Sequence, residues 1–93
     1  MIDSIRKTCT AGTVTEFTLS ASAVACRVKN FSDGAVLVCT GNEWDENHNI
    51  RINSNMYEDI RANSEPGGGP RHAFCKVLIQ AATTGIVEVI RHG

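Results

Sequence analysis

Four cysteines are the residues of this chain best suited to chemistry, because a thiol can form a disulfide, bind a metal or act as a nucleophile. They are Cys9, Cys26, Cys39 and Cys75. No two of them have the C-x-x-C spacing typical of a zinc site, so a metal site would have to be assembled from distant positions. We interpret them as buried, reduced thiols, and a disulfide and a metal site are the two alternatives.

The histidines and carboxylates give no catalytic pattern. His48, His72 and His92 fall in predicted loops or near the end of the chain, which favours surface histidines. Carboxylate pairs such as Glu43 and Asp45 lie in polar segments, without the apolar surroundings that raise the pKa of a general acid. Serine, cysteine and histidine form no recognisable nucleophile arrangement. We therefore expect no enzyme, no metal and no cofactor.

Two segments resemble ligand-binding loops only in part. Residues 45–49 supply oxygen ligands at the spacing of a calcium loop, but Ile50 stands where that loop requires glycine and Met56 where it requires glutamate. Residues 66–70 are rich in glycine, but they lack the Gly-Lys-Ser/Thr ending of a phosphate-binding loop. A solvated turn and a flexible linker are the better interpretations.

Composition predicts a fold made of strands. Valine and isoleucine together number 16, leucine only 3 and threonine 8, and branching at Cβ suits a pleated sheet better than a helix. We expect an all-β fold, a small antiparallel two-sheet sandwich of about six to eight short strands, either a jelly roll or Ig-like. The formal net charge of −1 argues against nucleic-acid binding.

The chain is expected to form a single domain. Residues 1–12 are polar and without a clear period, which predicts a flexible N-terminal arm, followed by one sandwich domain over 13–93. Residues 62–72 contain three consecutive glycines between two prolines, which predicts a long mobile loop. No apolar run is long enough for a membrane span, and the first residues lack the apolar segment of a signal peptide, so we expect neither a transmembrane segment nor export.

Alternation of apolar and polar residues locates the strands. It predicts Phe17 and Leu19 facing inward in one strand, and Val24, Cys26 and Val28 facing inward in the next. The expected strands are 13–21, 23–29, 35–40, 50–53, 56–61, 73–81 and 86–91, with a single helical turn as the alternative for 56–61.

Two hairpins are expected from the turn residues. Asp33-Gly34 predicts a type I′ turn that pairs 23–29 with 35–40 and places Cys26 and Cys39 on one face. A short turn ending in Gly85 predicts that 73–81 pairs with 86–91. The strand 35–40 is apolar on both faces, which indicates a central strand or one covered by a partner, and makes Val36 and Val38 interface candidates.

The chain resembles a known group of proteins in four segments, 28–38, 50–52, 57–60 and 77–89. A basic strand ends in asparagine and turns at glycine, and the chain finishes on apolar strands with a Thr-Gly corner. This layout resembles the small β-sandwich structural proteins of tailed bacteriophages and prophages, of the head-decoration, head-fibre or tail-associated type. The resemblance implies a non-enzymatic virion subunit, located in the virion or in the host cytoplasm during assembly. It would contact copies of itself or other virion proteins.

A binding module is the alternative function. In an Ig-like or carbohydrate-binding sandwich, the loops 41–49 and 62–72 would contact the ligand. Trp44 and Tyr57 are the candidate ligand residues, because large aromatic rings with a polar group often stack on sugars or form interface hot spots. Packing of Trp44 against the end of the sandwich is the purely structural interpretation.

Overall fold

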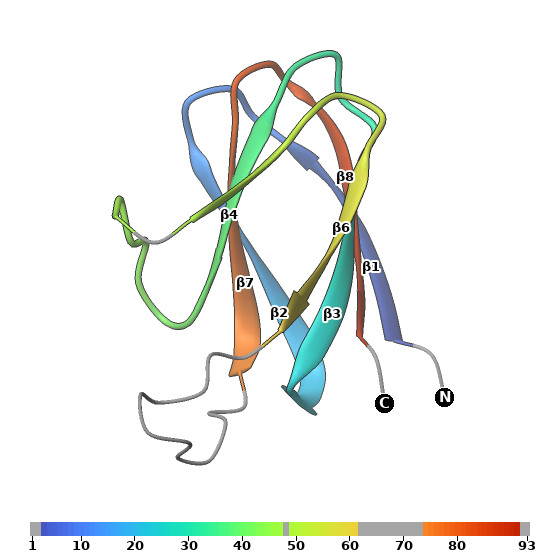
Figure 1. The fold of residues 1–93 in the computed structure, drawn as a ribbon, viewed down its shortest axis with the longest axis vertical. Helices are drawn as coiled ribbons and strands as arrows, with labels where there is room; N and C mark the ends of the chain where they lie inside the picture. The colour runs from blue at the N-terminus through green and yellow to red at the C-terminus, as the bar shows by residue number, and fades with distance from the viewer. Residues whose placement is uncertain (1–2, 48, 62–73, 92–93) are drawn as a thin grey trace.

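The computed structural model describes residues 3–47, 49–61 and 74–91 (Figure 1). This part of the chain forms eight strands. They are β1 (Asp3–Cys9), β2 (Val14–Ala23), β3 (Ala25–Asn30), β4 (Val36–Thr40), β5 (Ile50–Ile52), β6 (Tyr57–Arg61), β7 (Phe74–Ala81) and β8 (Gly85–Arg91).

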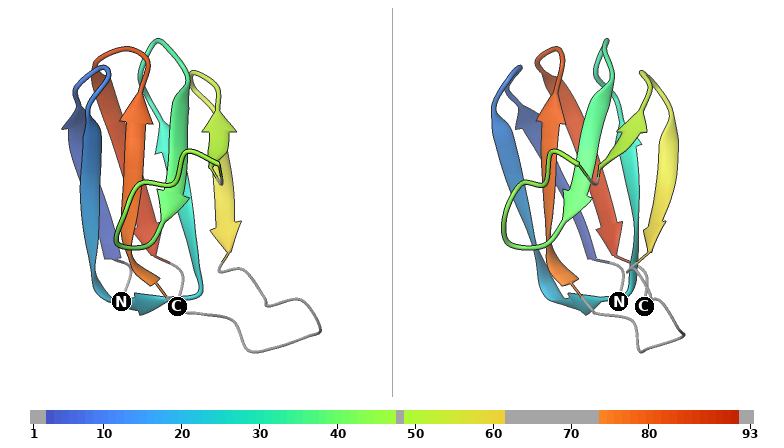
Figure 2. Two further views of the ribbon diagram at one scale, coloured as in Figure 1. Left: turned by 90° about the vertical axis from the view of Figure 1, so that its left-hand side faces the viewer. Right: turned by 60° about the vertical axis from the view of Figure 1, so that its left-hand side comes forward.

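The strands form two four-stranded antiparallel sheets packed face to face (Figure 2). Sheet A has the order β1-β8-β3-β6, and sheet B has the order β2-β7-β4-β5. The predicted all-β two-sheet sandwich is confirmed. Of the two predicted topologies, the observed strand order is that of the eight-stranded jelly roll, in which a long antiparallel hairpin is rolled so that most connections cross between the sheets.

The register shows how this hairpin is rolled. Asp3 pairs with Arg91 in β1–β8, and Val14 pairs with Gln80 in β2–β7. Val14 follows Asp3 by eleven residues, and Gln80 precedes Arg91 by eleven residues, so the two pairings share one continuous register. A paired ribbon therefore crosses from one sheet to the other without inserting a residue on either side.

A second ribbon crosses between the sheets beside the first. Asn30 pairs with Val87 in β3–β8, and Val36 pairs with Ala81 in β4–β7, again in one register. Backbone hydrogen bonds continue the ladder through the corner, from Phe31 N–H to the Ile86 carbonyl and from Ala82 N–H to the Ala35 carbonyl, each at 3.0 Å. The β7–β8 corner is consequently held by the β3–β4 corner along its whole length.

The inward faces of both sheets form the core. Phe17 and Leu19 of β2 and Cys26 and Val28 of β3 are buried, as the alternation predicted. Val24 is 46% exposed, because it lies at the bend between β2 and β3 where the alternation is interrupted. The central core cluster consists of Cys9, Phe17, Leu19, Ala23, Cys26, Val28, Val36, Val38, Ile52, Ile60, Phe74, Val77, Ile79, Ala81, Val87 and Val89.

Both predicted hairpins are wrong. β3 and β4 lie in different sheets, and so do β7 and β8. Neither Asp33 nor Gly34 has the positive φ that a type I′ turn needs; the positive φ angles of the described residues are at Gly12, Gly41 and Asn55. Glycine at these corners allows two chain segments to approach closely, which gives the same sequence signal as a tight hairpin turn.

The predicted flexible arm over 1–12 is also corrected. Residues 3–9 form β1, which pairs with β8 along its full length, so the domain begins well before residue 13. Cys9 is fully buried and Ile5 packs against the core, and these contacts fix a strand whose other residues are polar. The predicted mobile loop 62–72 lies outside the described residues.

Candidate functional site

Four exposed apolar side chains gather at one end of the outer face of sheet A. Phe31 is 48% exposed, Met56 57%, Tyr57 55% and Ile86 43%. Phe31, Met56 and Tyr57 line one hollow, and Ile86 accepts the backbone hydrogen bond of Phe31. We call these four residues the Phe31 patch. Clustered exposed apolar residues on a small domain are typical of an interaction surface.

The jelly-roll corners position this patch. Phe31 follows the last residue of β3, Ile86 lies near the start of β8, and Met56 precedes β6. The Asn30 N–H donates to the Met56 carbonyl (2.9 Å), which brings the β5–β6 connection beside the end of β3. Asn55, with φ of 60°, makes the turn that places Met56 there. Residues far apart in sequence are thus held on one surface.

A buried polar network lies directly beneath the patch. The Asn30 side-chain amide donates to the carbonyls of Gly34 (2.8 Å), Ile52 (3.1 Å) and Asn53 (3.2 Å), and its Oδ1 accepts from the Ser32 N–H (2.9 Å) and hydroxyl (2.6 Å). Asn30 and Ser32 are both buried, so these bonds satisfy groups that water cannot reach. The network ties the β3–β4 corner to the β5–β6 connection.

Cationic side chains surround the patch. The Arg6 guanidinium lies 5.4 Å from the centre of the Phe31 ring, and the Arg27 guanidinium lies 4.6 Å from that of Tyr57. Both arrangements are cation–π contacts. Arg27 also makes two hydrogen bonds to the Asp59 carboxylate, at 2.8 and 3.2 Å, and this pairing raises the pKa of Arg27. Each of the two aromatic rings of the patch therefore has a guanidinium group beside it.

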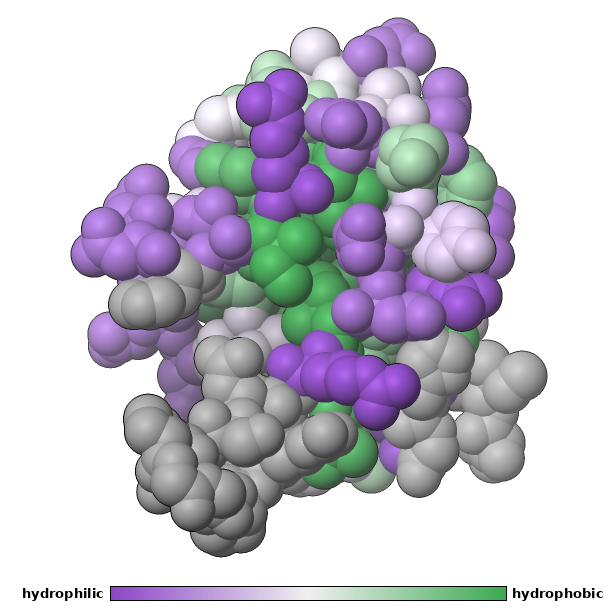
Figure 3. Space-filling model, in the orientation of Figure 1, coloured by the Kyte–Doolittle hydropathy of each residue, from purple (hydrophilic) through white to green (hydrophobic). Residues whose placement is uncertain are grey.

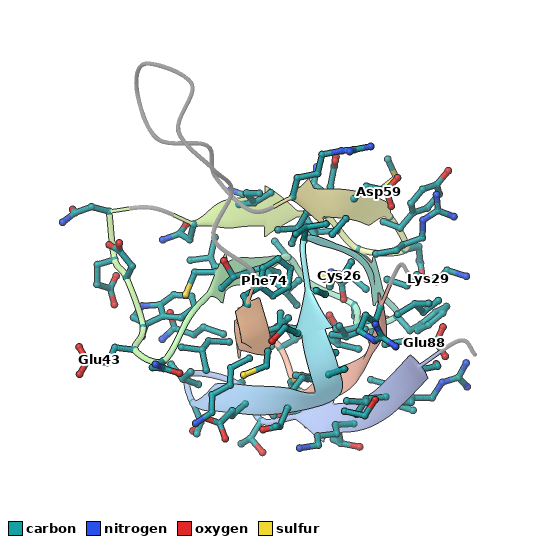
Figure 4. All side chains as sticks on the ribbon, turned by 90° about the horizontal axis from the view of Figure 1, so that it is seen from below. Cys26, Lys29, Glu43, Asp59, Phe74 and Glu88 are labelled. Carbon is teal, nitrogen blue, oxygen red and sulfur yellow. The ribbon has the colours of Figure 1, made fainter. Side chains whose placement is uncertain are left out.

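Lys29 is the cation of this surface that has no ionic partner among the described residues. It lies between Glu88 and Tyr57 in the cross-strand register, and Figure 4 shows it on the same side of the sandwich as Glu88. Glu88 accepts two hydrogen bonds from Arg6, at 3.0 and 3.2 Å, with Arg6 on the strand opposite Lys29. The surface thus combines aromatic rings with a lysine that is opposite Glu88 in the register but makes no ion pair among the described residues.

Val36 and Val38, the predicted interface candidates of β4, are fully buried in the core. Their selection as interface residues is wrong, since they point between the sheets. β4 is a central strand, as expected, and its outward-facing residues are Leu37 and Cys39. The apolar run gave no indication of which alternate set faces outward.

The outer face of sheet B is partly covered by the chain itself. The β4–β5 loop, described at residues 41–47 and 49, crosses in front of β4 and β7 in Figure 2. Cys39 and Leu78 of these strands are buried although they lie outside the central core cluster. Beyond the loop, an open hollow of about 410 Å³ is lined by Gly12, Ala35, Leu37, Arg51, Gln80, Ala81 and Ala82.

The edge of the sandwich is open below the short strand β5. On the face shown in Figure 3, apolar residues form a strip between β4 and β6 that polar residues surround. Val38, Ile50 and Ile60 line a hollow there. Only Ile50 of these three is largely exposed, so this edge presents far less apolar surface than the Phe31 patch.

Trp44 and Tyr57 do not come together. Trp44 is half-buried in the 41–49 loop and its indole N–H donates to Glu46 (2.7 Å). Tyr57 belongs to the edge strand of the other sheet and forms part of the Phe31 patch. A ligand site shared by the two rings is therefore not formed by the described residues.

The four cysteines are free thiols, three of them buried. Cys9, Cys26 and Cys39 are buried, Cys75 is exposed, and all four thiols are free. Burial raises the pKa of Cys26 to about 12 and also raises the pKa values of Cys9 and Cys39. Cys26 and Cys39 lie in different sheets, so the prediction that they share one hairpin face is wrong. Within the described part of the chain, no three metal-ligating side chains come together.

The fold and the patch define a jelly-roll β-sandwich with an apolar and cationic surface at one end. Comparison of the chain with protein-family models, curated proteins and solved structures finds no match. The described residues contain no helix long and apolar enough to cross a membrane. Tyr57 of this surface was predicted from the sequence. Phe31, Met56, Ile86 and Lys29 were not, because their proximity depends on the corner register.

Proposed function

We propose that this chain is a non-enzymatic structural or decoration subunit of a tailed-phage or prophage virion that acts through protein–protein contacts. The observation that carries the proposal is the Phe31 patch, in which four large apolar side chains remain about half exposed on a domain of 93 residues. Their burial against another protein would remove this apolar surface from water. Jelly rolls occur in viral capsid proteins, which is compatible with the resemblance described above.

The test is retention on particles. Virions or prophage particles are purified on a density gradient from the source strain, and the chain is quantified by mass spectrometry against the major particle protein. We expect a fixed ratio for the natural chain and a strong loss of retention for Phe31→Ser. Val24→Ser is the matched control, because Val24 is 46% exposed at the β2–β3 bend and lies outside the patch. A chain that is absent from particles would contradict the proposal.

A carbohydrate-binding module is the second candidate. The specific observation in its favour is the exposed Tyr57 ring, which has the Arg27 guanidinium 4.6 Å from its centre and Lys29 beside it. Jelly rolls also occur in lectins, and aromatic rings stack on sugars. Binding to a glycan array that Tyr57→Ala abolishes, together with no retention on particles, would favour this second function.

A further inference from the structure

The 41–49 loop complements the Phe31 patch in charge. It contains Glu43, Trp44, Asp45 and Glu46, and its sequence includes no lysine or arginine. Glu43 is exposed and has no ionic partner among the described residues. On the patch the complementary group is Lys29, which makes no ion pair among the described residues, whereas Arg6 and Arg27 are paired with Glu88 and Asp59. Exposed apolar side chains lie beside Lys29.

The loop is held in shape before it meets any partner. The Trp44 indole donates to Glu46 (2.7 Å), the Asn47 N–H donates to the Asp45 carboxylate (2.9 Å), and the Asn49 amide donates to the carbonyls of Asp45 (3.3 Å) and Glu46 (3.2 Å). These bonds reduce the conformational entropy that docking would cost.

The loop and the patch cannot meet within one molecule. Figure 4 shows Glu43 on one side of the sandwich, pointing away from it, and Lys29 on the opposite side. The loop crosses the outer face of sheet B, whereas the patch lies on sheet A (Figure 2). Two complementary surfaces on opposite sides of one chain are suited to a head-to-tail contact between copies, which generates a ring or an open filament.

We infer that the partner of the Phe31 patch is a second copy of this chain, whose 41–49 loop docks on the patch with Glu43 beside Lys29. This inference rests on the proposed function, because it names the partner of the same surface. Rings and filaments of identical subunits are the arrangements that a virion component needs. The ion pair makes the association depend on salt, since exposed charges are screened at high ionic strength.

Charge reversal tests the contact with pure protein. Sedimentation velocity is measured over a concentration series at low salt for the natural chain, for Lys29→Glu, for Glu43→Lys and for their equimolar mixture. We expect concentration-dependent oligomers for the natural chain and a self-association constant weakened by about tenfold or more in each single variant. The mixture is expected to assemble again, because each variant then meets a surface of opposite charge. Circular dichroism verifies that both variants fold.

Arg51→Glu is the matched control for Lys29→Glu, because Arg51 is an exposed cation on sheet B that lies outside the patch. It should leave self-association within about twofold of the natural chain. Two results would overturn the inference: a natural chain that stays monomeric at every concentration, or a mixture that assembles no better than its components. If the chain is monomeric but retained on particles through Phe31, the partner is another protein and the proposed function stands. If the chain is monomeric and is also not retained on particles, both the inference and the proposed function are wrong.

Discussion

Replacement of Gly85 by alanine tests the rolled topology directly. A Cβ at position 85 would lie 2.5 Å from the Cβ of Ser32 and 2.7 Å from its Cα. These distances are far below van der Waals contact, and the second involves backbone. Ser32 cannot move away easily, because its N–H donates to Asn30 (2.9 Å) and its carbonyl accepts from Ser54 (2.6 Å). The clash must therefore be relieved by separating the two corners.

The expected destabilisation follows from that geometry. Overpacking a well-packed site costs about 1–3 kcal/mol, and a clash with fixed backbone belongs at the upper end, at about 3 kcal/mol. For a domain of this size, 1 kcal/mol corresponds to roughly 4–8 °C in Tm. Gly85→Ala should consequently lower Tm by about 12–24 °C.

Thermal unfolding followed by circular dichroism, with urea titration as a second measure, gives the required values. Gly34→Ala tests the same contact from the other corner, because a Cβ there would meet side-chain atoms of Thr83, Oγ1 at 2.9 Å and Cγ2 at 3.1 Å, and no backbone atom within that distance; it should destabilise less than Gly85→Ala. Gly12→Ala is the control, since it has open space and only the strain of φ at +76°, about 1–2 kcal/mol. If Gly85→Ala costs no more than Gly12→Ala, the β7–β8 corner does not pack on the β3–β4 corner, and the reasoning from register is wrong.

Three further predictions concern buried polar groups and thiols. Asn30→Ala removes the three amide hydrogen bonds and leaves buried carbonyls unpaired, so the free energy of unfolding in urea should fall by about 2–4 kcal/mol. The pKa of Cys26 rises from 9.0 to about 12 on folding, so the unfolded state loses its proton first. The contribution of Cys26 to stability should thus decrease as pH rises from 9 toward 12, by up to about 1.4 kcal/mol per pH unit. Cys26→Ala should reduce the slope of stability against pH in urea titrations by that amount. Alkylation followed by mass spectrometry should label the exposed Cys75 first. Trp44→Ala should raise labelling of Cys39 on the order of tenfold, because the Asp45 backbone next to Trp44 hydrogen-bonds that thiol; unchanged labelling would mean that the loop does not protect it.

The alternation of apolar and polar residues predicted several strands, because it depends only on residues that are neighbours in the sequence. It located β2 and β3, and it placed Phe17 inward. It missed β1, because the exposed Lys7 stands between Ile5 and Cys9 in the alternating set and interrupts its apolar pattern. Only pairing with β8, eighty residues away, makes that segment a strand.

The pairing of strands could not be predicted because a corner and a hairpin use the same residues. Asp33-Gly34 and Thr84-Gly85 both reverse the chain direction, and glycine is needed in either case. The residue that distinguishes a corner from a hairpin lies far away in the sequence. At position 85 glycine is required because Ser32, more than fifty residues earlier, packs against it. Sequence alone shows the glycine and not the segment that packs against it.

The candidate surface was partly predictable for a related reason. Tyr57 was identified as an aromatic residue with a polar group, and it is exposed in the Phe31 patch. Val36 and Val38 were selected from a run that is apolar on both faces, where a shift of one residue exchanges the inner and outer sets. Phe31 and Lys29 had no distinctive sequence pattern, because their significance comes from the corner that places them beside Met56.

The stability of the fold and the shape of the interaction surface depend on the same residue. Asn30 lies in the chain between Lys29 and Phe31, and its buried amide fixes the corner and the β5–β6 connection on either side. Recognition by this surface therefore requires little rearrangement, which favours docking of preformed shapes over folding on binding. The partner that we infer, the 41–49 loop of a second copy, is likewise held by its own hydrogen bonds before it docks.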